Sequence, residues 1–275
     1  MTGARPPLAT GASRVSILIP AYNAAGHLES VVGRIPAAIW RSVETVWIVD
    51  DGSTDGTAAA IGRAATSRPE VRSIAFAANR GYGAAVKAAL VRIRAEDVHA
   101  AVCLHADGQY APENIPDLLD ALGGRRLDLV QGSRLASGGA LAGGMPLYKL
   151  VAGHVLSAVE SAAFRMRMTD YHSGYLCYGR RALDLVPFER LSDGFDFDLE
   201  AIAASRALGL RIGEVPIPTH YGDEVSHLSP VPYGLRALWV VAKYLAGGYA
   251  RLVAPACPAG RPAARWSRKP AGGGV

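Results

Sequence analysis

Residues 46–57 read Val-Trp-Ile-Val-Asp-Asp-Gly-Ser-Thr-Asp-Gly-Thr, an apolar run that stops at two adjacent carboxylates. A continuous apolar run is typical of a buried parallel strand. Asp50 and Asp51 then lie at the carboxyl end of that strand, where open α/β sheets bind ligands. A turn that only caps the next helix needs one polar residue, such as Thr54 or Asp55. Two neighbouring carboxylates repel each other unless a basic or hydrogen-bonding partner uses them, so we expect a binding role here.

Strand-like and helical stretches alternate along the chain with short links. Strands are expected at 15–20, 45–49, 71–76, 99–104, 127–131, 172–178 and 210–215. Helices are expected at 28–35, 55–66, 84–94, from Pro112 onward, 146–166 and 197–208. This alternation predicts an α/β fold with a mostly parallel, Rossmann-like sheet flanked by helices.

One domain over residues 14–232 accounts for these elements. We expect a flexible segment at 1–13 before it, and an amphipathic helix at 233–254 with a disordered basic tail at 255–275 after it. The Gly/Ala/Ser-rich residues 137–144 are expected to form a mobile lid.

Composition narrows the class of protein. Half of the 275 residues are hydrophobic and 19% are charged, which fits a soluble α/β enzyme and argues against disorder. The three cysteines lack CxxC spacing and residues 1–13 lack an apolar h-region, so we expect a reducing, cytoplasmic location without disulfides, a zinc site or a signal peptide. No acidic residue follows Glu224, and the net charge of +5 therefore comes from the tail. Nucleic-acid binding is not expected.

The loops exclude a dinucleotide site and favour another ligand. The first strand is followed by Pro-Ala-Tyr-Asn rather than by GxGxxG, and no Walker lysine motif occurs. Polar loops instead follow the first, second and fourth strands, at 20–22, 50–51 and 107. Carboxylates there suit ribose hydroxyls, base imino groups and a metal that holds a diphosphate.

Four motifs in this order resemble those of family 2 glycosyltransferases with the GT-A fold. They are Ile-Pro-Ala-Tyr-Asn at 19–23, Val-Asp-Asp-Gly-Ser-Thr-Asp-Gly-Thr at 49–57, Asn-Arg-Gly-Tyr-Gly at 79–83 and Ala-Asp-Gly-Gln-Tyr at 106–110. The resemblance continues through 131–134, 172–175 and 221–224, and it looks closest to the dolichyl- or polyprenyl-phosphate sugar synthases. It implies that a hexose moves, with inversion, from a UDP- or GDP-linked sugar to a polyprenyl phosphate.

The resemblance also implies roles for individual residues. Donor contacts fall on Pro20, Ala21, Tyr22, Asp50, Asp51, Gly83 and Lys87. Asp107, helped by Gln109, would bind Mn²⁺ or Mg²⁺. Family members often have Asp-x-Asp where this chain has His105-Ala106-Asp107. His105 either is a further metal ligand, which would suit Mn²⁺ better than Mg²⁺, or only hydrogen-bonds at the strand end. Loss of the first carboxylate also leaves open a nucleotide-sugar-binding protein without catalysis.

The acceptor decides which residues are catalytic. A lipid phosphate is already ionised, with a second pKa of about 6, and needs only cations to hold it. Arg134 and Lys149 match basic positions of the lipid-phosphate branch, although Lys149 could be an ordinary solvated helix residue. A saccharide hydroxyl, as in cell-wall or polysaccharide synthesis, needs a carboxylate base. Asp196 and Asp198 are the candidates, unless they only stabilise a helix N-terminus.

Residues 233–253 have the pattern of an interfacial helix. Apolar side chains recur with helical spacing at Leu235, Leu238, Trp239, Ala242, Leu245, Tyr249 and Leu252. Arg236, Lys243 and Arg251 gather on the other side, and a lysine at mid-bilayer would cost about 2.5–3.5 kcal/mol, which favours lying on the membrane over crossing it. Peripheral contact with the inner face of the cell membrane would suit a lipid acceptor. The alternative is a helix that packs on the catalytic domain.

Overall fold

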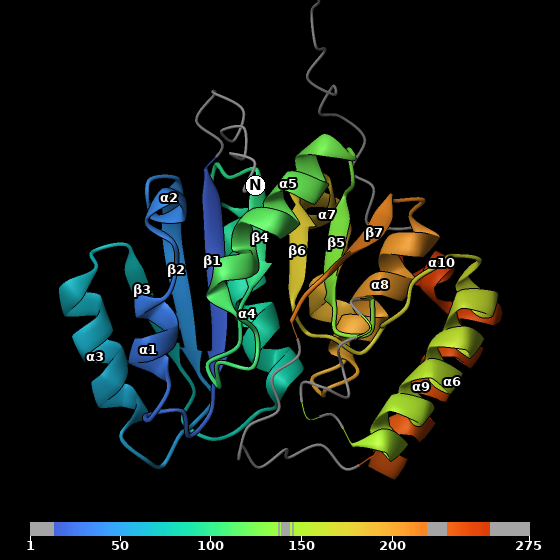
Figure 1. The fold of residues 1–275 in the computed structure, drawn as a ribbon, viewed down its shortest axis with the longest axis horizontal. Helices are drawn as coiled ribbons and strands as arrows, with labels where there is room; N and C mark the ends of the chain where they lie inside the picture. The colour runs from blue at the N-terminus through green and yellow to red at the C-terminus, as the bar shows by residue number, and fades with distance from the viewer. Residues whose placement is uncertain (1–13, 137, 139–143, 145, 219–229, 254–275) are drawn as a thin grey trace, which may run out of the picture.

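The computed structural model describes residues 14–136, 138, 144, 146–218 and 230–253. Its centre is a seven-stranded sheet of order β3-β2-β1-β4-β6-β5-β7 (Figure 1). The strands are β1 Val15–Ala21, β2 Val43–Asp50, β3 Val71–Ala75, β4 Ala100–Cys103, β5 Leu129–Ser133, β6 Leu176–Gly179 and β7 Ile212–Pro216. Neighbours pair in parallel, except that β6 runs antiparallel to β4 and β5. The predicted α/β fold with a mostly parallel sheet is confirmed.

Helices cover both faces of the sheet (Figure 1). They are α1 Leu28–Gly33, α2 Ala37–Trp40, α3 Thr57–Ser67, α4 Tyr82–Arg94, α5 Ile115–Gly124, α6 Leu147–Phe164, α7 Arg180–Leu185, α8 Phe197–Ala207, α9 Pro230–Leu245 and α10 Gly248–Val253, with 3₁₀ turns η1 Pro112–Asn114 and η2 Phe188–Arg190. Successive strand residues point to opposite faces, so Leu18 packs with α4 and α8, whereas Ile17 and Ile19 pack with α1, α3 and α5.

Strand 172–178 is shorter than expected, because β6 begins only at Leu176. The residues before it use their backbone groups elsewhere: the N–H of Gly174 donates to the Tyr110 hydroxyl, and the carbonyl of Ser173 accepts from the Gln131 amide. The short helices α2 and α7 were not predicted, since neither is long enough to show a helical period.

The C-terminal segment differs from the expected single helix at 233–253. The helix α9 ends at Leu245, and α10 begins at Gly248. Gly247 has φ 72°, a left-handed conformation that glycine adopts without steric cost. This break turns Tyr249 and Leu252 toward the core, although both were expected on the same apolar stripe as Leu235.

Several expectations fall on residues that the structure does not describe. These are the flexible start at 1–13, most of the lid at 137–144, the motif at 221–224 and the basic tail at 255–275. Over the described ranges, no helix combines the length and the apolar character needed to cross a bilayer.

Candidate active site

The register of the sheet brings the predicted loops to one edge. Ala21 at the end of β1 lies opposite Asp50 at the end of β2, and the N–H of Asp51 donates to the carbonyl of Ala21 at 2.8 Å. On the other side of β1, Leu18 lies opposite Cys103, the last residue of β4. The segments 20–22, 50–51 and 105–109 therefore leave the sheet side by side. This is the topological position at which open α/β sheets bind ligands.

Backbone donors hold the two adjacent carboxylates. Asp50 Oδ1 accepts from the N–H of Ser53 at 2.9 Å, and Asp51 accepts from the N–H groups of Arg80 at 2.7 Å and Gly81 at 3.0 Å. Both aspartates are buried, so these bonds offset their desolvation and their mutual repulsion. The carboxylate of Asp51 thus fixes the Asn-Arg-Gly loop at 79–81 against the end of β2.

Gly83 and Lys87 lie on α4 against the segment that precedes α8. A Cβ on Gly83 would come within 2.5 Å of the carbonyl oxygen of Ser192, so only glycine allows this approach. The Lys87 ammonium donates to the carbonyl of Leu191 at 2.9 Å and pairs with Asp193 Oδ1 at 2.6 Å. Tyr22, also expected to contact the donor, is 41% exposed at the end of β1.

Asp107 lies in the loop after β4, where Oδ1 accepts from the N–H of Gln109 at 3.0 Å. No three His, Cys, Asp or Glu side chains among the described residues form a group that could hold a metal ion. A single carboxylate is nevertheless enough when a bound diphosphate supplies the other oxygens, which is how Mg²⁺ is often held. Asp107 therefore fits a metal that arrives with a nucleotide diphosphate.

The imidazole of His105 is fixed from several sides. Its Nε2 lies 3.0 Å from the hydroxyl of Tyr82, and its ring meets that of Tyr110 edge-on at 4.8 Å. A Cβ on Gly174 would come within 2.5 Å of Nε2, so the backbone there closes over this nitrogen. Burial lowers the pKa of His105, the charge of Asp107 opposes that shift, and Arg134 adds to it. The contacts with Tyr82 and Tyr110 thus fix the orientation of the imidazole ring after β4.

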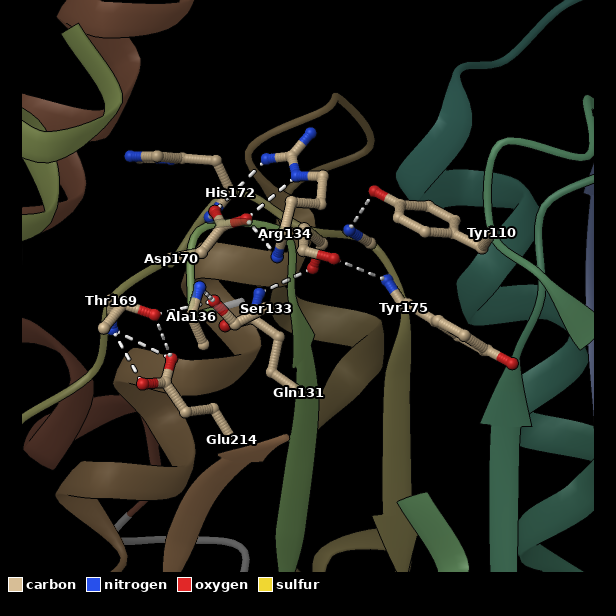
Figure 2. A network of polar contacts seen from close by, with 12 residues as sticks. Tyr110, Gln131, Ser133, Arg134, Ala136, Thr169, Asp170, His172, Tyr175 and Glu214 are labelled. Atoms are coloured by element: carbon tan, nitrogen blue, oxygen red, sulfur yellow. Dashed lines mark hydrogen bonds and ion pairs between the residues drawn. The ribbon is translucent and has the colours of Figure 1, made fainter. Parts of the chain in front are cut away.

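Arg134 follows β5 and forms a two-pronged ion pair with Asp170 (Figure 2). Arg134 Nε donates to Asp170 Oδ2 at 2.8 Å, and a terminal nitrogen donates to Oδ1 at 3.2 Å. Burial raises the pKa of Asp170, but the charge and hydrogen bonds of Arg134, together with His172, hold that pKa below its usual range. The charge of Arg134 therefore stands in a fixed position, while Lys149, the other expected cation, lies in the first turn of α6.

A second polar contact extends this network to α9. The N–H of His172 donates to Asp170 at 2.9 Å, and His172 Nδ1 lies 2.9 Å from the hydroxyl of Tyr233. On the other side of the ring, Nε2 lies 3.3 Å from Glu160, whose burial raises its pKa. Asp170, Glu160 and Tyr233 were not predicted as site residues. They lie far from Arg134 in the sequence, and no spacing links them to it.

The two candidate bases lie at the start of α8, in different surroundings. Asp196 accepts from the Ser192 hydroxyl at 2.8 Å and lies 3.5 Å from a terminal nitrogen of Arg236. Asp198 is buried beside Tyr82, and its desolvation raises its pKa to about 7 although a hydrogen bond from Tyr82 lowers it. Protein groups thus surround both carboxylates.

Comparison with known proteins identifies relatives that match most of the chain. The glycosyl transferase family 2 model matches residues 16–190. An undecaprenyl-phosphate mannosyltransferase of Micrococcus luteus is 33% identical over 207 residues, which cover 74% of this chain and 82% of that protein. A polyprenol monophosphomannose synthase of Mycolicibacterium smegmatis is 30% identical over 217 residues, covering 78% and 80%.

Solved structures agree on the fold. Glucosyl-3-phosphoglycerate synthase of Mycobacterium tuberculosis in complex with UDP superposes with a TM-score of 0.64 at 19% identity, covering 89% of this chain and 87% of that chain. The same enzyme with Mn²⁺, UDP and phosphoglyceric acid gives 0.63 at 19% identity, covering 90% and 85%. The family model spans more than half of the sequence, and the two relatives, at 33% and 30% identity, align with 74% and 78% of this chain. This chain therefore belongs to glycosyl transferase family 2.

Proposed function

We propose that the chain transfers a hexose, with inversion, from a UDP- or GDP-linked sugar to a polyprenyl phosphate. The observation that carries this proposal is the Arg134–Asp170 pair, which holds a planar cation where β5 ends. The strands β2 and β4, which precede Asp51 and Asp107, end at the same edge of the sheet. An arginine fork suits the oxygens of a phosphate. The lipid-phosphate acceptors named for the Micrococcus and Mycolicibacterium relatives support the same acceptor class.

The turn after β2 and the loop after β4 would hold the donor. Asp50 and Asp51 offer carboxylate oxygens to the nucleoside, with Pro20, Ala21 and Tyr22 beside them. A divalent ion, Mn²⁺ or Mg²⁺, would supply charge neutralisation for the departing diphosphate, with Asp107 as its protein ligand and Gln109 assisting. The neighbours solved with UDP and Mn²⁺ support this assignment.

The acceptor requires little proton chemistry. The second pKa of a phosphate monoester is about 6, so its attacking oxygen is anionic near neutrality. Arg134, and Lys149 from α6, would position it on the face of the sugar opposite the leaving diphosphate, which inverts the anomeric centre. In this mechanism Asp196 and Asp198 need not act as bases, in agreement with their contacts to protein groups.

We further propose that the α6/α9 face lies on the inner surface of the cell membrane. This face consists of the exposed apolar side chains of two helices that pack side by side (Figure 1). Its residues are Leu147, Tyr148, Val151, Val155 and Val159 of α6, and Leu235, Leu238, Trp239 and Leu245 of α9. Of the basic side chains expected on the other side of the helix, Lys243 pairs with Glu200 at 2.9 Å, and Arg236 lies 3.5 Å from Asp196.

Charge and connectivity favour a membrane as the partner of this face. The sequence after residue 253 adds Arg261, Arg265, Arg268 and Lys269 without any acidic residue, and each cation near an anionic bilayer contributes roughly 1 kcal/mol. Tyr233 in the first turn of α9 bonds His172, which is held by the same Asp170 that fixes Arg134. The α6/α9 face and the proposed phosphate site thus share one network.

The test is a transfer assay with purified protein, radiolabelled UDP- and GDP-sugars and vesicles that contain undecaprenyl phosphate. We expect a butanol-extractable glycolipid with one nucleotide class, and its loss in Arg134→Ala while calorimetric binding of the nucleotide remains. Transfer to a saccharide but not to the lipid, abolished by Asp196→Asn, would replace the proposed acceptor. Tight nucleotide-sugar binding without any transfer would indicate a binding protein.

A further inference from the structure

A hollow of about 360 Å³ lies at the edge of the sheet opposite to Arg134. Its wall includes Leu127, which precedes β5, and Ile212, the first residue of β7. These two strands pair in parallel, and β5 ends at Ser133, directly before Arg134. Pockets for small molecules usually have volumes of about 300–1,000 Å³. The hollow is therefore separate from the proposed donor and acceptor sites and has room for a small ligand.

Three arginines line this hollow, and none of them forms an ion pair with a residue that the structure describes. Arg206 Nε donates to the carbonyl of Phe164 at 2.8 Å. A terminal nitrogen of Arg211 donates to the carbonyl of Arg125 at 2.7 Å. Arg167 donates to no group in the described part of the chain. A carbonyl oxygen carries only a partial charge, so the three guanidinium charges stay largely uncompensated.

The carboxylates of the neighbouring strands are engaged elsewhere. Asp128 Oδ2 accepts from the backbone N–H of Arg211 at 2.8 Å and lies 3.4 Å from a terminal nitrogen of Arg181. Glu214 accepts from the N–H of Thr169 at 2.8 Å and from its hydroxyl at 3.0 Å. Neither carboxylate pairs with a guanidinium that lines the hollow. The positive charge there is thus left for an anion from outside the described chain.

The capping of helix ends explains only part of this arrangement. Arg206 donates to the last carbonyls of α6, and Arg211 donates to the residue that caps α5. Cations suit such helix ends. A guanidinium has five N–H groups, however, and a terminal nitrogen of Arg206 and the Nε of Arg211 keep theirs without an acceptor among the described residues. The caps therefore fix two guanidiniums in place and leave donors for a ligand, to which Arg167 adds its own.

We propose that the hollow binds a phosphate group, with Arg167, Arg206 and Arg211 as its donors. The parallel N–H groups of a guanidinium match two phosphate oxygens at once. Met166 and Met168 also line the hollow, and less polar surroundings strengthen the attraction between charges. The phosphate belongs either to a free phosphate ester or to an anionic lipid, since the hollow lies at the C-terminal end of α6 and the α6/α9 face begins on that helix. The inference goes beyond the proposed transfer reaction and does not depend on it.

The methyl groups of Met166 and Met168 provide the test, because both side chains line the hollow. The full chain, labelled with ¹³C at its methionine methyl groups, is titrated with inorganic phosphate in EDTA at constant ionic strength and followed by NMR. Met166→Leu and Met168→Leu assign the two signals. We expect both signals to shift and to reach saturation.

Substitutions at the hollow should weaken this titration. Arg167→Gln/Arg211→Gln should need at least tenfold more phosphate for the same shift, because one hydrogen bond to a charged group is already worth about tenfold in affinity. Arg72→Gln/Arg92→Gln is the matched control, since it removes the same charge from β3 and α4, outside the hollow. This control variant should titrate like the wild type.

Vesicles distinguish the two sources of the phosphate. Each cation near an anionic bilayer contributes a factor of about five to binding. If a lipid headgroup occupies the hollow, Arg167→Gln/Arg211→Gln should bind phosphatidylglycerol vesicles at least tenfold more weakly than Arg72→Gln/Arg92→Gln does. If the ligand is a free phosphate ester, the two double variants should sediment with these vesicles equally, while only the first loses the methyl shifts.

Three results would overturn the inference. They are methyl signals that do not shift to saturation with phosphate, equal titrations of the two double variants, and loss of the shifts in Arg134→Ala, which would place the phosphate at the proposed acceptor site. Arg167→Gln alone guards against a folding defect, because Arg167 bonds no described residue. It should keep the melting temperature of the wild type and weaken phosphate binding about tenfold. Failure of lipid transfer would leave the methyl titration unchanged, so the two proposals fail separately.

Discussion

The guanidinium of Arg134 and the carboxylate of Asp170 form a two-pronged ion pair in which Asp170 is almost fully buried, with N–O distances of 2.8 and 3.2 Å. The same carboxylate also accepts from the N–H of His172. A buried charge pair of this kind contributes little net stability compared with apolar side chains of equal size. The pair instead fixes the position of the Arg134 guanidinium, so that a phosphate can bind it.

Asp170→Asn should therefore impair both stability and acceptor binding. Breaking a buried pair by removing one partner costs about 3–5 kcal/mol, because the other charge stays uncompensated. We expect a drop of that order in the free energy of unfolding by urea, and an increase in the KM for the lipid phosphate that exceeds any change in the KM for the nucleotide sugar.

The pair between Arg34 and Glu113 is a matched control for this substitution. It has the same two-pronged geometry, at 2.9 Å for both bonds, but both side chains are exposed. Exposed pairs are worth about 0–1 kcal/mol, so Glu113→Gln should change neither stability nor KM appreciably. Equal effects of the two substitutions would mean that burial of the Asp170 pair has no special role.

Gly52→Ala should disrupt the turn after β2. Gly52 has φ 71°, and a Cβ there would lie 2.4 Å from the backbone carbon of Ala78. The positive φ alone costs about 1–2 kcal/mol for an L-residue, and the contact forces the turn away from the 79–81 loop that Asp51 holds. We expect a lower melting temperature and weaker nucleotide binding by calorimetry.

Gly62→Ala provides the opposite case. Gly62 is exposed within α3, and a Cβ there meets nothing within 4 Å. Alanine in a helix interior is more stable than glycine by about 0.5–1 kcal/mol, so this variant should melt higher and bind nucleotide like the wild type. A stabilised Gly52→Ala would contradict the strain assigned to that turn.

The stability of the protein should fall with rising pH because of Asp198. Burial raises its pKa to about 7 in the folded chain, against an ordinary value of 3.8. A group with a raised folded pKa stabilises the fold fully below its unfolded value and loses that contribution as the pH rises through the folded one. The shift corresponds to at most about 4 kcal/mol between pH 4 and pH 7.

Urea unfolding of Asp198→Asn and of the wild type at pH 4, 6 and 8 measures this contribution. The variant should match the wild type at pH 4 and be increasingly more stable as the pH rises. Asp184→Asn, which removes an exposed carboxylate paired with Arg180, should show no such divergence. Parallel curves for wild type and Asp198→Asn would show that Asp198 does not resist ionisation in the fold.

The sequence alone was enough to place the loops of the proposed donor site at one edge of the sheet, because the geometry of parallel strands is simple. Parallel strands end at one edge, so apolar runs followed by Pro20–Tyr22, Asp50–Asp51 and Asp107 could be placed together without any contact being known. The ordered motifs then pointed to the family, which the match over residues 16–190 confirms.

Contacts between distant segments could not be predicted in the same way. Asp170 is 36 residues from Arg134 and lies in no periodic element, so no spacing joins them. The run Phe195-Asp196-Phe197-Asp198 does not reveal which carboxylate is buried, because that depends on how α8 packs against α4. In residues 233–253, the left-handed Gly247 separates α9 from α10. The packing of α9 against α8 leaves Leu235 and Trp239 exposed, and hydrophobicity alone does not predict this orientation.

The exposed apolar side chains of the α6/α9 face should hold the protein on anionic membranes. Trp239 and Leu235 are one turn apart on α9 and are 69% and 65% exposed. Transfer of such a side chain out of water is worth about 1.5–3 kcal/mol, and aspartate at the same place would oppose insertion. Leu235→Asp/Trp239→Asp should therefore reduce sedimentation with phosphatidylglycerol vesicles by about tenfold or more, since about 1.4 kcal/mol already corresponds to tenfold. Surface substitutions usually change stability by less than about 0.5 kcal/mol, so the fold should persist.

Val91→Asp is the matched control for this double variant, because Val91 is 40% exposed on α4, outside the α6/α9 face. It should sediment with vesicles like the wild type. Neutral phosphatidylcholine vesicles should bind the wild type less than anionic ones, because the cations beyond residue 253 add attraction only where the lipid is charged. If instead the double variant binds vesicles normally but changes a dimer into a monomer in light scattering, the face joins two copies of the chain. The lipid acceptor would then have to reach Arg134 by another route.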